Sequence, residues 1–197
     1  MPWLWHLTRC MPRVIALKAL ALWQRSYKYV GMSREILFMR HGKAANPDGV
    51  GDFDRPLTAR GVRQARSVGE WLLAHDALPD AVLSSPALRA QQTAEETLRA
   101  AGLAPAMIRT DARLYFNTHA KLMAALGEAA GIGSRLLVVG HNPWLEELVL
   151  EIAADPVPHP GGNWYMKTGT LMRFDVTGLA PGSGKLLDHI LPDGRGG

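Results

Sequence analysis

The sequence predicts a three-layer α/β/α sandwich with a mostly parallel central sheet. From residue 35 onward, short apolar runs typical of buried strands alternate with stretches of helical spacing. Such alternation favours a parallel sheet covered by helices on both faces. The chain has 197 residues and is 47% hydrophobic, which is enough for one sizeable core. Polar residues directly follow three of the apolar runs, where ligands bind in folds of this kind.

The predicted strands are short and mainly aliphatic. We expect them at residues 36–39, 81–83, 107–109, 135–139, 170–174 and 185–190. The run RLLVV at 135–139 is the most strand-like of the six, and the last two flank a Gly/Pro-rich turn.

The predicted helices lie between these strands, at residues 58–75, 85–101, 118–130 and 142–153. The first has an apolar stripe at helical spacing: Val62, Ala65, Val68, Trp71 and Leu72. Thr58 is its expected N-cap. Ser85 before Pro86, and Asn142 before Pro143, predict capped starts for two others. Gly102 is expected to end the second helix.

Residues 1–33 differ in composition from the remainder of the chain and form a basic, Trp-rich N-terminal extension. Residues 1–34 hold six of the 22 basic residues and none of the 18 acidic ones, so the remainder carries a net charge of −2. The body is therefore not a basic nucleic-acid binder, and no nucleic acid partner is expected. Three interpretations of the extension stay open: a membrane-contacting or targeting segment, a helix packed on the domain, and a product of a misplaced start before Met32.

The chain holds one cysteine, Cys10, and no apolar stretch long enough to cross a bilayer. An intrachain disulfide and a cysteine-based zinc site are therefore excluded, and a cytoplasmic location is expected. Acidic residues do not cluster with histidines in a ligand pattern such as H-E-x-x-H, so we expect neither a metal nor a cofactor.

Three of the predicted strand ends carry conspicuous residues, in the stretches MRHGK, SSPALRA and VVGHNPW. Arg89 lies near a helix start, and helical side chains lean toward the N-terminus. Its guanidinium would add to the free N–H groups there and make an anion site suited to phosphate. A solvated surface arginine is the alternative for Arg89 taken by itself.

Two histidines, His41 and His141, stand at the ends of apolar runs, each beside a glycine. Either one alone could be a core histidine with a satisfied hydrogen bond. A neutral imidazole is also a nucleophile toward phosphorus, and covalent catalysis splits one hard displacement into two. Arg40, Arg89 and His141 would then stabilise the charge on the phosphoryl oxygens. Gly42 would let the backbone approach the bound group closely.

These ordered motifs resemble the histidine phosphatase superfamily, which has the phosphoglycerate mutase-like fold. The stretch DFDRPLTARG at 52–61 is similar to the SixA-type phosphohistidine phosphatases within it. The likeness spans about residues 35–190 and implies a histidine phosphatase domain at 34–197.

The resemblance implies that His41 takes the phosphoryl group, and that Arg40, Arg89 and His141 complete the phosphate pocket. It also implies that Arg55 helps to bind phosphate or substrate, whereas a salt bridge with Asp52 or Asp54 is the alternative. We expect Gly42 and Asn142 to lie against substrate as well.

This chain lacks the acid that many superfamily members use to protonate the leaving group. The segment DARLYFNTHA contains no glutamate, and Asn142 rather than aspartate follows the second histidine. An alcohol leaving group needs that proton, whereas the nitrogen of a phosphoramidate can already be protonated. Asp48, Asp52, Asp54 and Asp111 remain possible donors.

The sequence therefore predicts a metal-independent phosphatase with a phosphohistidine intermediate, acting on phosphohistidine in proteins. The expected partner is a phosphate-bearing substrate, in particular a phosphohistidine-containing protein. Two alternatives stay open: a phosphomonoesterase of small metabolites, and a phosphate-binding adaptor without catalytic activity.

Overall fold

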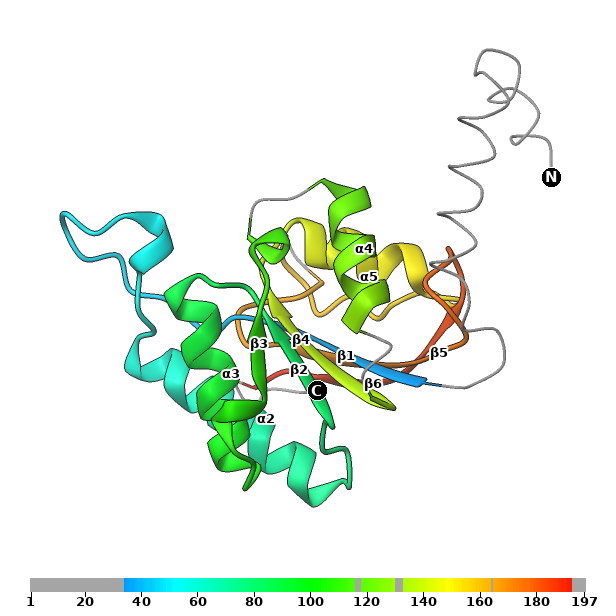
Figure 1. The fold of residues 1–197 in the computed structure, drawn as a ribbon, viewed down its shortest axis with the longest axis horizontal. Helices are drawn as coiled ribbons and strands as arrows, with labels where there is room; N and C mark the ends of the chain where they lie inside the picture. The colour runs from blue at the N-terminus through cyan, green and yellow to red at the C-terminus, as the bar shows by residue number, and fades with distance from the viewer. Residues whose placement is uncertain (1–33, 116–117, 130–132, 164, 193–197) are drawn as a thin grey trace, which may run out of the picture.

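A single six-stranded sheet runs through the computed structural model, which describes residues 34–115, 118–129, 133–163 and 165–192 (Figure 1). The interpretations of the basic extension lie outside the described residues. The strands follow the spatial order β3-β2-β4-β1-β5-β6. Their bounds are β1 Arg34–Arg40, β2 Ala81–Ser84, β3 Ile108–Thr110, β4 Arg135–Gly140, β5 Leu171–Val176 and β6 Gly184–Ile190.

Four neighbouring strands of this sheet are parallel. β1 and β2 both pair in parallel with β4, and β3 pairs in parallel with β2. β5 runs antiparallel to β1, and β6 antiparallel to β5. The predicted mostly parallel sheet is thus confirmed, and its carboxyl-terminal edge is shared by β1, β2 and β4.

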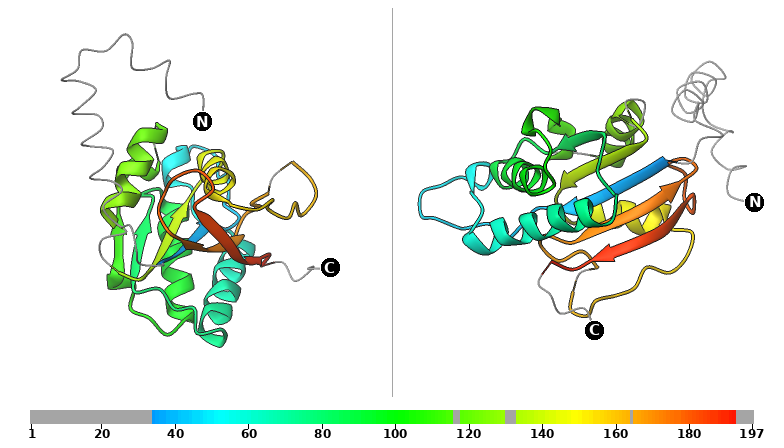
Figure 2. Two further views of the ribbon diagram at one scale, coloured as in Figure 1. Left: turned by 90° about the vertical axis from the view of Figure 1, so that its right-hand side faces the viewer. Right: turned by 90° about the horizontal axis from the view of Figure 1, so that it is seen from below.

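Helices cover both faces of the sheet and complete the predicted three layers (Figure 2). The helices are α2 Ala59–Ala74, α3 Leu88–Ala100, α4 His119–Ala129 and α5 Trp144–Ile152. Three short 3-10 helices lie in the connections of the described ranges: η2 Asp52–Asp54, η3 Pro105–Met107 and η4 Ala112–Leu114. No helix in the described part of the chain is both long and apolar enough to span a membrane.

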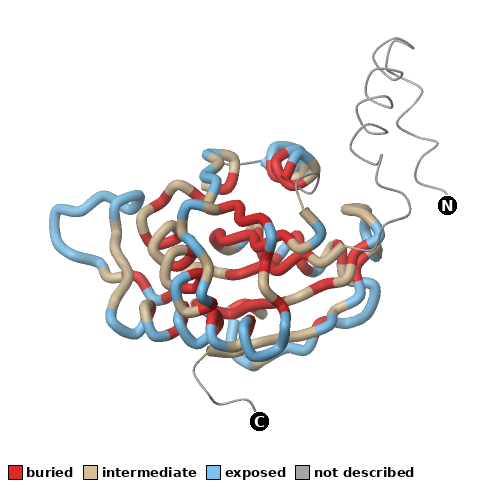
Figure 3. Tube along the Cα trace, turned by 60° about the horizontal axis from the view of Figure 1, so that its bottom comes forward, coloured by how far each residue is buried: buried red, intermediate tan, exposed pale blue. Residues whose placement is uncertain are grey.

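The core consists of two apolar clusters on opposite faces of the sheet, and the buried layer is visible in Figure 3. Successive side chains of a strand point to opposite faces, so the apolar run at 36–39 within β1 serves both clusters. Ile36 and Phe38 pack with residues of α4 and α5, whereas Leu37 and Met39 pack with residues of α2 and α3. Burial on both faces explains why this strand shows no polar alternation.

The helix starts agree only partly with the sequence predictions. Thr58 is the N-cap of α2, as predicted, because its hydroxyl accepts a hydrogen bond from the amide of Gly61. Ser85 and Asn142 as N-caps are wrong, since α3 begins at Leu88 and α5 at Trp144, and neither has a side-chain cap. Both polar side chains are instead engaged within the site described below.

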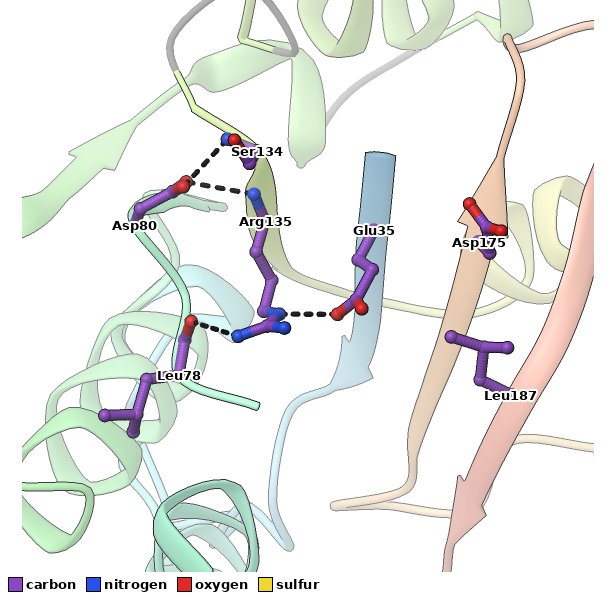
Figure 4. Close-up of a pocket in the computed structure, with 7 residues that line it drawn as sticks. All are labelled: Glu35, Leu78, Asp80, Ser134, Arg135, Asp175 and Leu187. Carbon is purple, nitrogen blue, oxygen red and sulfur yellow. Dashed lines mark hydrogen bonds and ion pairs between the residues drawn. The ribbon is translucent and has the colours of Figure 1, made fainter. Parts of the chain in front are cut away.

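The amino-terminal edge of the sheet is held by a polar network around a cavity of about 320 Å³ (Figure 4). The Asp80 carboxylate accepts hydrogen bonds from the amides of Ser134 and Arg135, at 2.8 and 3.0 Å. The Arg135 side chain pairs with Glu35 and donates to the Leu78 carbonyl. These groups join the starts of β1 and β4 to the segment before β2, at the opposite strand ends from the predicted site.

Gly69 lets α2 approach α3 closely, because a Cβ there would lie only 2.1 Å from the Thr97 carbonyl oxygen. We predict that Gly69→Ala lowers the free energy of unfolding by about 1–3 kcal/mol, the usual cost of overpacking. Denaturant unfolding measures this change.

Gly127→Ala is the matched control, since a Cβ at this position of α4 would meet no atom within 4 Å. It should stabilise the fold by about 0.5–1 kcal/mol through helix propensity. Equal effects of the two substitutions would contradict the close approach of α2 and α3.

Candidate active site

The three predicted strand ends meet at one edge of the sheet. Arg40 at the end of β1 stands opposite Gly140 at the end of β4. The amide of His41 donates to the Gly140 carbonyl at 3.0 Å, and that of Ser85 donates to the Val139 carbonyl at 2.9 Å. These backbone bonds bring His41, His141 and the start of the α3 segment together.

His41 is held in one tautomer. Its Nδ1 lies 2.7 Å from the Gly42 carbonyl oxygen, which can only accept, so Nδ1 carries the hydrogen. In the neutral ring, Nε2 therefore holds the lone pair, 3.3 Å from the Arg89 Nε–H that donates to it. Burial lowers the pKa of His41 to about 4. The Gly42 bond opposes this shift, whereas the charges of Arg89, Arg40 and Arg55 reinforce it. The ring is thus neutral at pH 7.

His141 lies beside His41, with 4.9 Å between the ring centroids. Its Nε2 is 2.8 Å from the Ser85 hydroxyl oxygen. Its Nδ1 is buried and has no hydrogen-bond partner among the described residues, so this is the ring atom left for a ligand. Burial, followed by the charges of His41 and Arg89, lowers the pKa of His141 to about 3. When the hydroxyl donates to Nε2, the neutral ring offers Nδ1–H to an anion.

Arg40 is braced by a network from α5 and the segment before β5. Its Nη1 donates to the Met166 carbonyl at 2.8 Å. The Asn142 amide donates to the same carbonyl at 3.1 Å and to the Glu146 carboxylate at 2.9 Å. Burial lowers the pKa of Arg40, while the charge of buried Glu146 opposes that shift. The Asn142 N–H groups thus bind protein atoms, and its predicted substrate contact stays a prediction.

Arg89 is buried, and its guanidinium is shared between His41 and the loop before α2. Besides the His41 contact, Nη1 donates to the backbone carbonyl of Asp52 and Nη2 donates to its carboxylate. Arg55 donates from Nη1 to the same carboxylate at 2.9 Å and from Nε to the Ala45 carbonyl at 2.8 Å. The salt-bridge alternative for Arg55 is therefore present, with Asp52 as the partner.

Gly42 is required by packing at this position. A Cβ would lie 2.6 Å from the carbonyl oxygen of Gly61, at the start of α2. Its amide donates to the Thr93 hydroxyl at 3.0 Å, and that hydroxyl donates to the Arg89 carbonyl at 2.6 Å. These contacts join the segment after β1 to α2 and α3, and an approach of Gly42 to substrate stays a prediction.

Several residues of this constellation were not assigned to the site from the sequence: Ser85 as the partner of His141, Asp52 as the partner of Arg89, and Thr93, Tyr115 and Glu146. The spacing of Asn142 and Glu146, four residues apart and so on one face of the predicted helix, was an available signal. The sequence gives no such signal for Tyr115. Its ring lies beside that of His141, with 5.5 Å between the centroids, only because the folded chain brings the two residues together. Over the described ranges, no group of three or more histidine, cysteine or acidic residues is placed to hold a metal ion.

Comparisons with known proteins agree with this geometry. The family described as the histidine phosphatase superfamily (branch 1) matches residues 36–115. An uncharacterized protein of Mycobacterium tuberculosis (strain H37Rv) is 42% identical over 117 residues, which cover 59% of this chain and 70% of that protein. Phosphohistidine phosphatase SixA of Escherichia coli (strain K12) is 34% identical over 127 residues, covering 63% and 77%. The structure of the protein histidine phosphatase SixA complexed with tungstate superimposes with a TM-score of 0.64 and 29% identity, covering 80% of this chain and 97% of that one.

The chain therefore belongs to the histidine phosphatase superfamily, and its six-stranded α/β fold is the phosphoglycerate mutase-like fold. Within the superfamily, its similarity is to the SixA-type phosphohistidine phosphatases. These relationships support phosphatase activity as the general kind of reaction.

The pKa values of the two histidines can be measured directly. We predict that NMR titration of the ring protons gives midpoints near 4 for His41 and near 3 for His141, because burial disfavours the charged rings. Each ring then stays neutral throughout the neutral range and gains its proton only as the pH falls through these values.

An unperturbed histidine ring titrates at about pH 6.5. Midpoints near that value for His41 and His141 would refute the neutral, buried pair.

Proposed function

We propose that this protein is a metal-independent phosphatase that removes phosphate from phosphohistidine in proteins, through a phosphohistidine intermediate on His41. One observation supports the proposal most strongly. The His41 ring is fixed with its hydrogen on Nδ1, and its Nε2 lone pair lies beside Arg89 and His141. The cytoplasm, expected from the single cysteine, is the proposed location.

The proposed reaction has two displacements at phosphorus. In the first, the Nε2 lone pair of His41 forms a bond to phosphorus, and the leaving group departs with the electrons of its own bond to phosphorus. In the second, a water oxygen bonds to phosphorus and loses a proton to solvent, while the N–P electrons return to Nε2. Inorganic phosphate is the product.

Positive and N–H donors surround the place where charge develops. Arg89 shifts its Nε–H from the lone pair of His41 to a phosphoryl oxygen, and Nδ1–H of His141 serves another. Arg40, braced by the Met166 carbonyl, supplies further positive charge. Fixed donors of this kind stabilise the spread charge of a phosphoryl group in transfer without a large rearrangement.

The state of the nearby carboxyl groups supports a phosphoramidate substrate. Burial raises the pKa of Asp52, but hydrogen bonds from Arg55, Tyr115 and Arg89 outweigh it and lower that pKa to about 2. The Arg113 side chain lowers the pKa of Asp111. Neither carboxyl therefore holds a proton to give at pH 7. An imidazole leaving group that already carries its proton needs no such donor.

The intermediate can be trapped chemically. We predict that brief reaction with a ³²P-labelled phosphohistidine protein labels the wild type on His41, and that His41→Ala abolishes the label. The same substitution should lower turnover by about 10³-fold or more, because the nucleophile is removed.

His119→Ala, which changes an exposed histidine on α4, should keep both label and turnover. Parallel assays with p-nitrophenyl phosphate and glycerol phosphate test the substrate class. Faster turnover of glycerol phosphate would favour a metabolite phosphatase, whereas phosphate binding without turnover of any substrate would favour an adaptor.

A further inference from the structure

The Asp52 carboxylate is the meeting point of three donors from three segments. It belongs to η2, in the loop before α2 that projects from the body of the molecule (Figure 1). Its Oδ1 accepts from Arg55 at 2.9 Å, and its Oδ2 accepts from Arg89 and from the Tyr115 hydroxyl, each at 2.9 Å. No other described carboxylate binds two site arginines at once.

These contacts divide the N–H donors of Arg89 between Asp52 and His41. A guanidinium is a planar fork with five N–H groups, and its two terminal nitrogens form one edge. Asp52 occupies that edge twice, with its backbone carbonyl on Nη1 and its carboxylate on Nη2. The other edge, formed by Nε and the second hydrogen of Nη2, faces His41 Nε2 at 3.3 Å from Nε.

We propose that Asp52 is a positioning residue, which holds the outer edge of Arg89 so that the inner edge presents two donors to the phosphoryl group on His41. This inference rests on the proposed function of the site. A buried arginine that lost Asp52 could rotate its plane, and bidentate contacts to phosphate depend strongly on that orientation.

A carboxylate near a bound phosphate also repels it, and this repulsion opposes the gain in phosphate binding from the positioning of Arg89. Here the negative charge faces two arginines at 2.9 Å and a phenolic hydroxyl, which neutralise it locally. The Asp52 side chain is also 56% exposed, so water screens its remaining field. We therefore expect orientation of Arg89 to outweigh repulsion.

Tyr115 supports Asp52 with a hydrogen bond and lies close to Arg89 as well. Its hydroxyl bonds the carboxylate, its ring lies 5.9 Å from the Arg89 guanidinium carbon, and the Phe53 ring packs against it edge-on at 5.1 Å. Removing the hydroxyl alone would loosen Asp52 without changing any charge. Tyr115→Phe is thus a milder version of the same perturbation.

The test measures binding of tungstate and of inorganic phosphate by calorimetry, beside steady-state kinetics with p-nitrophenyl phosphate. Asp52→Asn should weaken tungstate binding about tenfold, as expected when one charge-assisted contact to the oxyanion is lost. The same variant should raise KM about tenfold and change kcat much less, since the contact is already made in the bound substrate. Tyr115→Phe should weaken tungstate binding about threefold, and Asp52→Glu should recover part of the loss.

Asp54→Asn is the matched control, because it removes the same charge from the same short helix and should leave tungstate affinity and KM at wild-type values. Wild-type or tighter tungstate binding by a folded Asp52→Asn protein would overturn the inference. Should that variant fail to fold, unchanged tungstate affinity in Tyr115→Phe would overturn it instead. A wild type that neither binds tungstate nor turns over any phosphate substrate would refute the proposed function itself.

Discussion

The parallel pairing of β1 with β4 is the constraint on which the site depends. Because Arg40 stands opposite Gly140, the residues that follow the two strands, His41 and His141, leave the sheet side by side. β2 adds Ser85 at the same edge through its pairing with β4. The chemistry therefore rests on strand register. A shift of one residue would move either histidine away from the other and turn the following side chains to the opposite face.

The architecture and the main site residues could be predicted from the sequence, because the information is local. Buried parallel strands are continuous apolar runs, and in such a sheet ligands bind at the strand ends. Arg40, His41 and His141 stand at or just beyond the ends of such runs, and Arg89 lies at the start of the helix that follows one, so their convergence follows from topology. Thr58 was predictable as a cap for a similar reason, since its partner is three residues away.

The helix caps at Ser85 and Asn142 were predicted wrongly because α3 and α5 begin further along the chain, and both side chains also bind partners that are distant in sequence. The Ser85 hydroxyl bonds His141, 56 residues away, and the Asn142 amide bonds Glu146 and Met166. The same limit applies to Asp52 and Tyr115, which are 63 residues apart in the chain yet share a hydrogen bond. Local patterns cannot reveal partners that meet only after the sheet has formed. Sequence alone suggested a salt bridge for Arg55 but left Asp52 and Asp54 equal as partners.

The hydrogen bond from His41 Nδ1 to the Gly42 carbonyl has a chemical consequence for the intermediate proposed here. An imidazole has two nitrogen atoms that can carry a phosphoryl group, and the two products are different regioisomers. In this ring one nitrogen is committed to the backbone, so the proposed covalent species would form solely as the tele isomer, with phosphorus on Nε2. One main-chain carbonyl would thus set the regiochemistry of the proposed phosphoenzyme.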